Sequence, residues 1–279
     1  MANTTTAMAM AAALLAVGAS APDDPIAFED PLERRASRIA VDAAHLVYSE
    51  RVGDRSRIVT RARSGDHWQA PVAVFDAPSG TVAFASAISP DGQHLYFESN
   101  ARTPAVPGRE DSDVWVMEWQ SGAWRDARSL AAAYATPYNA HAPTVDEHGT
   151  LCFNSTRPGG LGRNDIYCGR PDEAPVLVAV LNSPQQDASA TLAASGESIV
   201  FASDRPGGLG GWDLYIAQRR GHEWLPPRNL GAPVNSAADE TGPSLWSKGG
   251  RLYFLRATPG SQATPQVFSV AFEERAAQH

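Results

Sequence analysis

The sequence predicts an all-β fold, a β-propeller of five four-stranded blades, from an internal repeat and the spacing of its anchor residues. Residues 153–167 and 201–215 are near copies, reading FNSTRPGGLGRNDIY and FASDRPGGLGGWDLY, and they begin 48 residues apart. Fainter copies keep one order of features: a turn, an apolar strand ending in an aromatic residue, a polar hairpin and a second strand. The anchor aromatic residues follow one another at 49, 56, 48 and 53 residues, the length of a propeller blade, and are Tyr48, Phe97, Phe153, Phe201 and Phe254.

Each unit is expected to hold four short strands, because apolar and polar residues alternate with period two between turn residues. In the first, second and fifth units, two successive strands are predicted on either side of the hairpin. They lie at 45–48 and 58–59, at 95–97 and 113–115, and at 252–254 and 267–268. The innermost strand of every blade lines the central channel of a propeller. These strands are predicted at 84–88, 141–145, 187–192 and 240–245.

The two ends of the chain complement each other. Residues 25–31 (PIAFEDP) are similar to residues 71–78 (PVAVFDAP), which we interpret as the fourth strand of the first unit. The fifth unit lacks a fourth strand of its own, since only residues 271–279 follow its third strand. We therefore expect the N-terminal strand to complete the last blade and close the ring, which removes exposed strand edges.

Composition and the N-terminus indicate an exported chain that does not bind nucleic acid. The formal charge of −8 and the absence of a basic cluster argue against phosphate-backbone recognition. Residues 7–17 are apolar and precede Gly18-Ala19-Ser20-Ala21, the pattern of a secretory cleavage site, so residues 1–21 are predicted to be a signal peptide and 22–279 one propeller domain. No run approaches the ~20 apolar residues of a membrane span. We expect a periplasmic or secreted monomer.

The residue pattern is similar to that of a known family. Ser-Pro-Asp-Gly before an apolar strand, then Phe-x-Ser-x-Arg-x-Gly-Gly-x-Gly-x-x-Asp-Ile/Leu-Tyr, resembles the TolB-like, or WD-like, repeat of bacterial envelope proteins. The resemblance covers about residues 25–270 and is most specific in the third and fourth units. It implies a propeller and a periplasmic interaction role. TolB itself has six blades, so six is the alternative to the five counted here.

Most recurring residues of the repeat have a structural interpretation. The Gly-rich segments 159–162 and 207–211 run into strands rather than into a helix, so they favour tight hairpins over a phosphate cradle. The recurring carboxylate at the head of a strand predicts a structural clamp, in which it accepts hairpin amides or pairs with the nearby guanidinium. One carboxylate per hairpin is too few ligands for calcium. We expect no metal and no cofactor. The residues of this clamp are Asp113, Asp165, Asp213, Arg157 and Arg205.

The two cysteines, Cys152 and Cys168, fall on neighbouring predicted strands of one hairpin. In an oxidising compartment they are candidates for a disulfide bond. The alternative is a pair of buried free thiols.

The channel offers the candidate chemistry. Aligned on the last apolar residue of each innermost strand, Asp187 and Glu240 occupy the same position, and His141 lies one step further on. A carboxylate pair at a channel mouth is what a glycoside hydrolase needs. The competing interpretation is that both carboxylates solvate the channel rim or bond neighbouring blades.

The preferred function is a non-catalytic module that binds an envelope protein, a peptide or a glycan, with a hydrolase as the alternative. His141, Asp187 and Glu240 are candidate binding residues at the channel. The long, charged hairpin 100–112 adds Arg102 and Arg109 as candidates for recognition.

Overall fold

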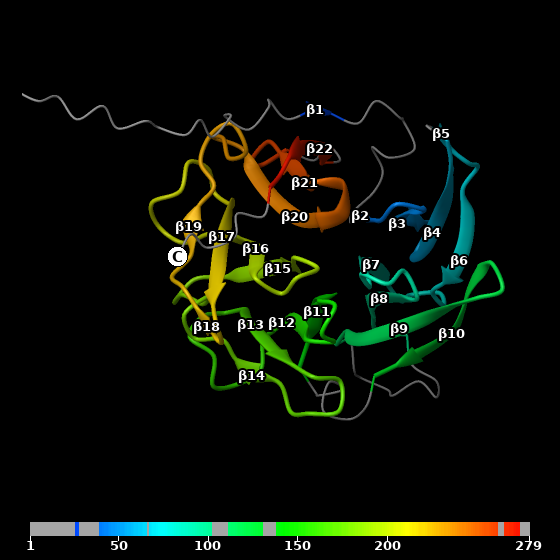
Figure 1. The fold of residues 1–279 in the computed structure, drawn as a ribbon, viewed down its shortest axis with the longest axis horizontal. Helices are drawn as coiled ribbons and strands as arrows, with labels where there is room; N and C mark the ends of the chain where they lie inside the picture. The colour runs from blue at the N-terminus through cyan, green and yellow to red at the C-terminus, as the bar shows by residue number, and fades with distance from the viewer. Residues whose placement is uncertain are drawn as a thin grey trace, which may run out of the picture.

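The chain folds into a five-bladed β-propeller, which confirms the predicted fold class (Figure 1). The computed structural model describes residues 26–27, 39–65, 67–101, 111–130, 138–261 and 265–273. Within these residues the strands form five antiparallel sheets around a central axis, and no helix is long and apolar enough to cross a membrane. The predicted signal peptide at residues 1–21, and both Arg102 and Arg109, lie outside the described residues.

The first two blades follow the chain outward from the channel. Blade 1 contains β2 (Ile39–Val41), β3 (His45–Val52), β4 (Arg55–Ser64), β5 (His67–Trp68) and β6 (Val72–Asp76). Blade 2 contains β7 (Ala83–Ile88), β8 (His94–Ser99), β9 (Asp113–Gln120) and β10 (Ala123–Ser129). In blade 1 both β5 and β6 pair with β4, so the outermost strand is made in two pieces.

Blades 3 and 4 are built from the two near copies of the repeat. Blade 3 contains β11 (Ala140–Val145), β12 (Leu151–Ser155), β13 (Asp165–Gly169) and β14 (Val176–Leu177). Blade 4 contains β15 (Asp187–Leu192), β16 (Ser198–Ser203), β17 (Asp213–Arg220), β18 (Glu223–Trp224) and β19 (Arg228–Asn229). The innermost strands begin within one residue of their predicted starts.

The N-terminal strand closes the ring, as predicted. Blade 5 contains β20 (Asp239–Trp246), β21 (Arg251–Ala257) and β22 (Gln266–Ala271), with the 3₁₀ turn η2 (Ser247–Gly249) between the first two. β1 (Ile26–Ala27) pairs antiparallel with β22, so that Ile26 faces Ser269 and Ala27 faces Phe268. The last blade is thus completed from the other end of the chain, and the edge of β22 is covered.

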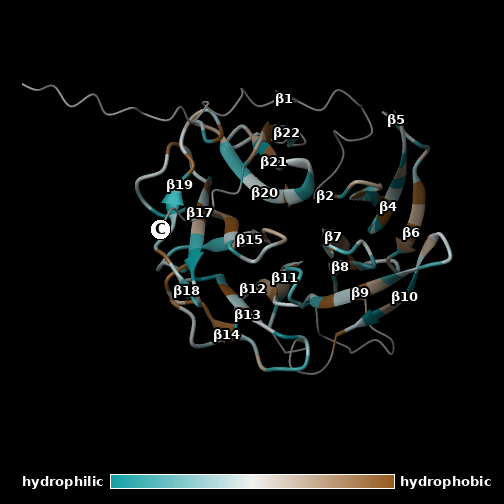
Figure 2. Ribbon diagram, viewed as in Figure 1, coloured by the Kyte–Doolittle hydropathy of each residue, from teal (hydrophilic) through white to brown (hydrophobic). Residues whose placement is uncertain are grey.

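The anchor aromatic residues form the buried centre of the blades. Period-two alternation drives them inward, and Figure 2 shows bands of opposite hydropathy along β4 and β9. In blades 3 to 5 each anchor ring stacks on the aromatic residue opposite it in the next strand, at centroid distances of 6.3, 6.1 and 5.9 Å. All five anchors are at most 1% exposed: Tyr48, Phe97, Phe153, Phe201 and Phe254.

Four innermost strands carry a β-bulge near their middle. The pairing register shifts between Ala85 and Ala87 in β7, and at corresponding positions in β11, β15 and β20. The bulge puts Ala142 and Ser189 at φ of 49° and 53°, and the preceding blade accepts their amides. Ala142 donates to Glu98 Oε2 at 2.7 Å, and Ser189 donates to Asn154 Oδ1 at 3.0 Å. The bulges therefore bond neighbouring blades and re-aim the ends of the channel strands.

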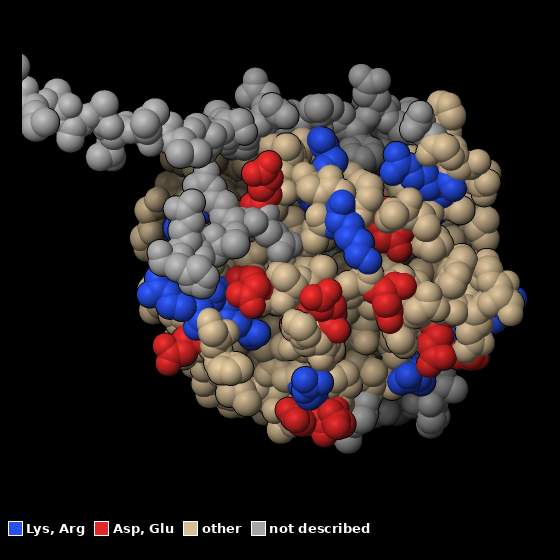
Figure 3. Space-filling view, viewed as in Figure 1, with Lys and Arg blue, Asp and Glu red and all other residues tan. Residues whose placement is uncertain are grey.

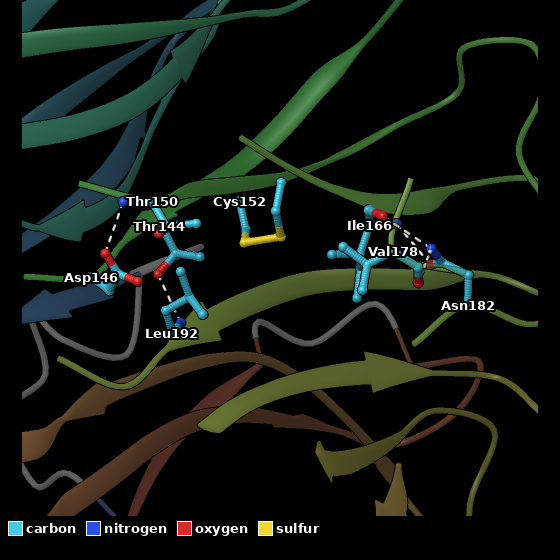
Figure 4. The surroundings of a disulfide bond; sticks show 9 residues. Thr144, Asp146, Thr150, Cys152, Ile166, Val178, Asn182 and Leu192 are labelled. Atoms are coloured by element: carbon cyan, nitrogen blue, oxygen red, sulfur yellow. Dashed lines mark hydrogen bonds between the residues drawn. A yellow bond between two sulfur atoms is a disulfide. The ribbon is translucent and has the colours of Figure 1, made fainter. Parts of the chain in front are cut away.

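Cys152 and Cys168 are joined by a disulfide bond (Figure 4). They face each other across β12 and β13, with their Cα atoms 4.1 Å apart. Cys152 is fully buried and packs in a cluster that includes Leu192 of blade 4. Beside the bridge, Thr144 of β11 accepts the Leu192 amide, so the disulfide braces a hairpin at the boundary between two blades.

Candidate functional site

Asp187 is enclosed by hydrogen bonds and has no exposed surface. Its Oδ1 accepts from Ser203 Oγ at 2.6 Å and from Arg205 Nη2 at 2.5 Å. Its Oδ2 accepts from the amide and the hydroxyl of Ser183 at 2.6 and 2.8 Å. Arg205 also donates to Leu181 O at 2.7 Å, so the pair fastens the loop between blades 3 and 4 to β15.

Glu240 repeats this arrangement one blade later. Arg256 Nε donates to Glu240 Oε1 at 2.7 Å. The Ser236 amide donates to Oε2 at 3.0 Å, and the Ser236 hydroxyl donates to Oε1 at 2.6 Å. Asp187 faces Ser203, and Glu240 faces Arg256 at the equivalent point of its blade, so the predicted equivalence of the two carboxylates is correct. Glu240 is also fully buried.

These ion pairs correct the expectation that Asp187 and Glu240 stand at a channel mouth. Each carboxylate is bonded by an arginine of its own blade and by the loop before its strand, and neither side chain is exposed to a substrate or a partner. Asp187 and Glu240 are therefore blade fasteners rather than binding residues or an acid/base pair, and the hydrolase alternative is not favoured. The sequence showed the equivalence of the two carboxylates but not which arginines would neutralise them. Arg205 lies 18 residues after Asp187, and Arg256 lies 16 residues after Glu240.

His141 pairs with a carboxylate that the sequence analysis missed. Its Nδ1 lies 3.2 Å from Oε1 of Glu98, a residue of β8 that is 3% exposed. Glu98 also accepts the Ala142 amide from the next blade. This pair joins blades 2 and 3 and keeps His141 half-buried. Glu98 is an acidic residue in an apolar strand, which was the one available signal of a special role.

The recurring aspartates at the heads of third strands bind the hairpins before them. Asp213 Oδ2 accepts the Leu209 amide at 2.7 Å, and Asp165 accepts the Gly162 amide at 3.1 Å. Burial raises the pKa of the Asp165 carboxyl, while the hairpin amides oppose that shift. Asp113, at the head of β9, is likewise buried.

Close approach explains two glycines of the repeat. A Cβ atom on Gly208 would lie 1.7 Å from Asp213 Oδ2, and one on Gly210 would lie 1.9 Å from the Ala238 carbonyl of the next loop. The glycine-rich segments are structural, because their space is filled by the clamp and by a neighbouring blade. No ligand could be cradled there.

The recurring arginines lie over aromatic rings. The Arg157 guanidinium is 5.0 Å from the centroid of the Phe153 ring and 4.9 Å from that of Tyr167. Arg205 and Arg256 lie over the equivalent ring pairs of blades 4 and 5. These cations therefore cover the stacked rings of the blade centres, and the clamp on hairpin amides is made by the aspartates.

A cavity of about 380 Å³ opens at the other end of the channel, where the innermost strands of all five blades end. Asp187 opens β15 and Glu240 is the second residue of β20, so the predicted site and the cavity lie at opposite ends of these strands. The cavity is walled by strand ends and by the turns that follow them, which differ in sequence from blade to blade. For that reason the repeat did not identify it.

Blades 1 and 2 supply an aromatic and charged side of this cavity. His45 is buried, with Nδ1 3.3 Å from Asp42 Oδ2 and its ring 4.4 Å from that of Trp119. Asp42 Oδ1 also accepts the amides of Ala44 and His45 at 2.7 and 2.6 Å. These hydrogen bonds fix the conformation of the turn, so His45 and Trp119 form a pre-organised part of the cavity wall.

Lys248, the single lysine of the sequence, lies at the rim. Its Nζ donates to the carbonyl of Pro90 at 3.0 Å, joining the turn of blade 5 to the turn of blade 2. Asp91, beside Pro90, accepts from Ser89 Oγ and from the Gln93 amide, both at Oδ1. Two carboxylates, Asp42 and Asp91, and one ammonium group, that of Lys248, thus line the cavity.

The face in Figure 3 carries side chains of both charges, with a group of basic side chains at its left edge. Among the described residues, no group of three or more His, Cys, Asp or Glu side chains is placed to hold a metal ion. The cavity is accordingly the feature of the described chain best formed to take a ligand.

Comparisons with known proteins identify the fold. No family model and no curated protein matches the sequence. Among solved structures, the chain is similar to TolB from Acinetobacter baumannii, with a TM-score of 0.53 and 15% identity over 85% of this chain and 55% of TolB. It is also similar to an α-L-arabinofuranosidase from Lactobacillus brevis, with a TM-score of 0.57 and 11% identity over 86% of this chain and 91% of the enzyme.

These similarities concern architecture. The chain spans about half the length of TolB. At 15% and 11% identity the likeness shows a shared propeller fold, which hosts binding proteins and hydrolases alike. The TolB-like character suggested by the repeat is therefore supported at the level of the fold.

Proposed function

We propose that this protein is a non-catalytic binding module of the bacterial cell envelope that takes a peptide or a glycan into the cavity at the channel mouth. The observation that carries the proposal is the cavity itself, which is built by all five blades and combines aromatic, hydroxyl and charged side chains. Small-molecule sites are concave, largely pre-formed and furnished with a few polar groups. The cavity has these features.

The absence of catalysis in the proposal follows from the buried ion pairs. The two carboxylates that sequence alignment brought forward are neutralised by arginines. At the cavity, Asp42 accepts hydrogen bonds from the amides of Ala44 and His45 and lies beside the His45 ring, so its oxygens are engaged by its own turn. We infer binding without bond cleavage.

Placement in the envelope is supported by the disulfide bond. Bridges such as Cys152–Cys168 persist in oxidising compartments and are rare in the bacterial cytoplasm. The predicted signal peptide leads to the same compartment. Expression of the whole sequence in a Gram-negative host, followed by fractionation and mass spectrometry, tests this. We expect a periplasmic chain that begins at Pro22 and contains no free thiol; a cytoplasmic, unprocessed, reduced chain would contradict the proposal.

The binding proposal is tested by filling the cavity. Ala87 lines it, and Ala87→Phe should abolish binding of any ligand recovered from peptide and glycan arrays. Val176→Phe is the matched control, because Val176 is 68% exposed on the outer strand of blade 3. Binding that survives Ala87→Phe, in a variant whose unfolding temperature is unchanged, would refute the use of this cavity.

A further inference from the structure

One residue from each innermost strand forms a ring in the wall of the cavity. Each member pairs with the residue that precedes the anchor aromatic of its blade, so the five positions are equivalent. All five line the cavity. In blade order this channel ring consists of Ala40, Ala87, Thr144, Thr191 and Ser244.

The channel ring is divided into two chemically different arcs. Blades 3, 4 and 5 contribute hydroxyl groups, and blades 1 and 2 contribute methyl groups. The surroundings of the five positions differ, because four of the strands carry a bulge and the Thr144 and Thr191 hydroxyl groups accept amides of the next blade. The division gives the channel ring one side that carries hydroxyl groups and one that carries methyl groups, below the charged turns of blades 1 and 2.

The hydroxyl arc has hydrogen-bond donors to spare. Thr144 Oγ1 accepts the Leu192 amide at 2.9 Å, and Thr191 Oγ1 accepts the Leu245 amide at 3.2 Å. A hydroxyl group that accepts an amide proton still carries its own proton. Thr144 and Thr191 therefore have fixed oxygen positions in the cavity wall, where they are 2% and 7% exposed, and the adjoining Ser244, 6% exposed, extends the row.

The opposite arc is apolar and aromatic. Ala40 and Ala87 present methyl groups, and Trp119, half-buried beside His45, also lines the cavity. Such a wall suits C–H groups and offers a ring for stacking.

Charge at the rim disfavours anions. Asp42 and Asp91 outnumber Lys248, and Lys248 is engaged by the Pro90 carbonyl. An exposed carboxylate such as Asp91 accepts hydrogen bonds from ligand hydroxyl groups but repels a ligand carboxylate. A ligand that suits the cavity is neutral, with hydroxyl groups on one edge and C–H groups on the other.

We propose that the cavity binds one neutral sugar ring, whose hydroxyl edge meets Thr144, Thr191 and Ser244 and whose C–H face lies against Ala40, Ala87 and Trp119. This inference rests on the proposed function and selects the glycan from its two ligand classes. The volume of about 380 Å³ lies at the small end of ligand pockets, which suits a single ring better than a peptide segment.

The test uses wild-type protein and a panel of methyl glycosides of neutral hexoses and N-acetylhexosamines, the matching hexuronic acids and neutral tripeptides. Saturation-transfer NMR identifies binders, and calorimetric titration gives their affinities. We expect binding of at least one neutral glycoside and at least tenfold weaker binding of its uronic acid. Equal or tighter binding of the uronic acid, or of tripeptides, would overturn the assignment.

Variants of the hydroxyl arc connect that binding to the residues. Ser244→Ala and Thr191→Val should each weaken neutral-glycoside affinity by about three- to tenfold, the loss of one hydrogen bond to an uncharged ligand. Thr191→Ser keeps the hydroxyl group and should retain affinity, even if Thr191→Val disturbs the Leu245 amide. Unchanged affinity in Ser244→Ala and Thr191→Val would refute the proposed contacts.

Failure of this inference and failure of the proposed function give different results. If Ala87→Phe abolishes binding of a tripeptide, the cavity is a binding site but the sugar assignment is wrong. If array ligands bind equally to wild type and Ala87→Phe, the proposed function is wrong as well.

Discussion

Nη2 of Arg205 lies 2.5 Å from Oδ1 of Asp187, while the Arg205 guanidinium rests 5.2 Å from the centroid of the Phe201 ring and 4.8 Å from that of Tyr215. The carboxylate is fully buried and its partner nearly so, at 0% and 16% side-chain exposure. One arginine thus joins the channel strand, the stacked rings of its blade and the Leu181 carbonyl of the preceding loop. The contact makes Asp187 a structural residue, and its energetic consequences can be measured.

Asp187→Ala should lower the free energy of unfolding by about 3–5 kcal/mol, because it leaves the Arg205 cation enclosed without its partner. Urea denaturation measures the loss. Asp187→Ala combined with Arg205→Met should recover part of it, since the unpaired charge is removed as well. The control is Glu118→Ala, which breaks an exposed pair with Arg128 and should change the free energy of unfolding much less. Equal losses in the two single variants would contradict a buried fastener.

Replacing both cysteines by alanine should lower stability by about 3 kcal/mol, the effect of opening a loop of this size in the unfolded chain. Cys152 and Cys168 are 16 residues apart. For a domain of this length the loss corresponds to a fall of about 6–12 °C in unfolding temperature. Scanning calorimetry with and without reductant checks it. Reductant should shift wild type and leave the double variant unchanged; a shift in both would point to another cause.

Stability should depend on pH through Asp165. Burial raises the pKa of its carboxyl above the usual 3.8, with the hairpin amides acting against that shift. The folded state therefore keeps this proton after the unfolded chain has lost it, and the contribution of Asp165 to stability falls as pH rises through that window. The stability of Asp165→Asn relative to wild type should therefore increase as pH rises above the usual carboxyl pKa of about 4, as measured by urea denaturation.

Asp54 is the control with the opposite sign. A hydrogen bond from Ser79 lowers the pKa of its carboxyl, so the stability of wild type relative to Asp54→Asn should increase as pH rises. Parallel pH profiles for Asp165→Asn and wild type would show that the folded and unfolded chains hold the Asp165 proton alike.

Removing β1 should expose the edge of β22. A chain that starts at residue 30 lacks Ile26 and Ala27, which pair with Ser269 and Phe268 respectively, whereas a chain that starts at residue 22 keeps them. An unpaired edge strand recruits other chains. Light scattering coupled to size-exclusion chromatography should find dimers or larger species for the shorter chain only. A monomeric shorter chain with an unchanged unfolding temperature would show that β1 is dispensable.

The sequence carried more of the fold than of the site. The repeat predicted the blades, four of the five channel strands to within one residue, and the equivalence of Asp187 and Glu240. Ring closure was also visible, because residues 25–31 match a fourth strand that the fifth unit lacks. These features are local or periodic, and a periodic pattern is repeated in every blade.

The repeat could not identify the cavity residues, because they do not recur from blade to blade. Asp42, Asp91 and Lys248 occupy turns whose sequences differ, and Lys248 meets Pro90 across 158 residues of chain. The arginine partners of Asp187 and Glu240 were equally hidden, because ion pairing depends on how strands turn their side chains. The channel ring was present in the sequence as Ala, Ala, Thr, Thr and Ser, but it has meaning only once the strand ends converge.

By itself, the sequence determined that this chain is a β-propeller closed by its N-terminal strand, since apolar periodicity and turn residues act over a few residues and recur in each blade. It favoured five blades over six, and the structure has five. Only the tertiary structure decided which polar residues remain available to a ligand. Burial withdrew Asp187 and Glu240 into ion pairs, while the convergence of five strand ends gathered Thr144, Thr191 and Ser244 around one cavity. Availability depends on packing between blades, which no single repeat encodes.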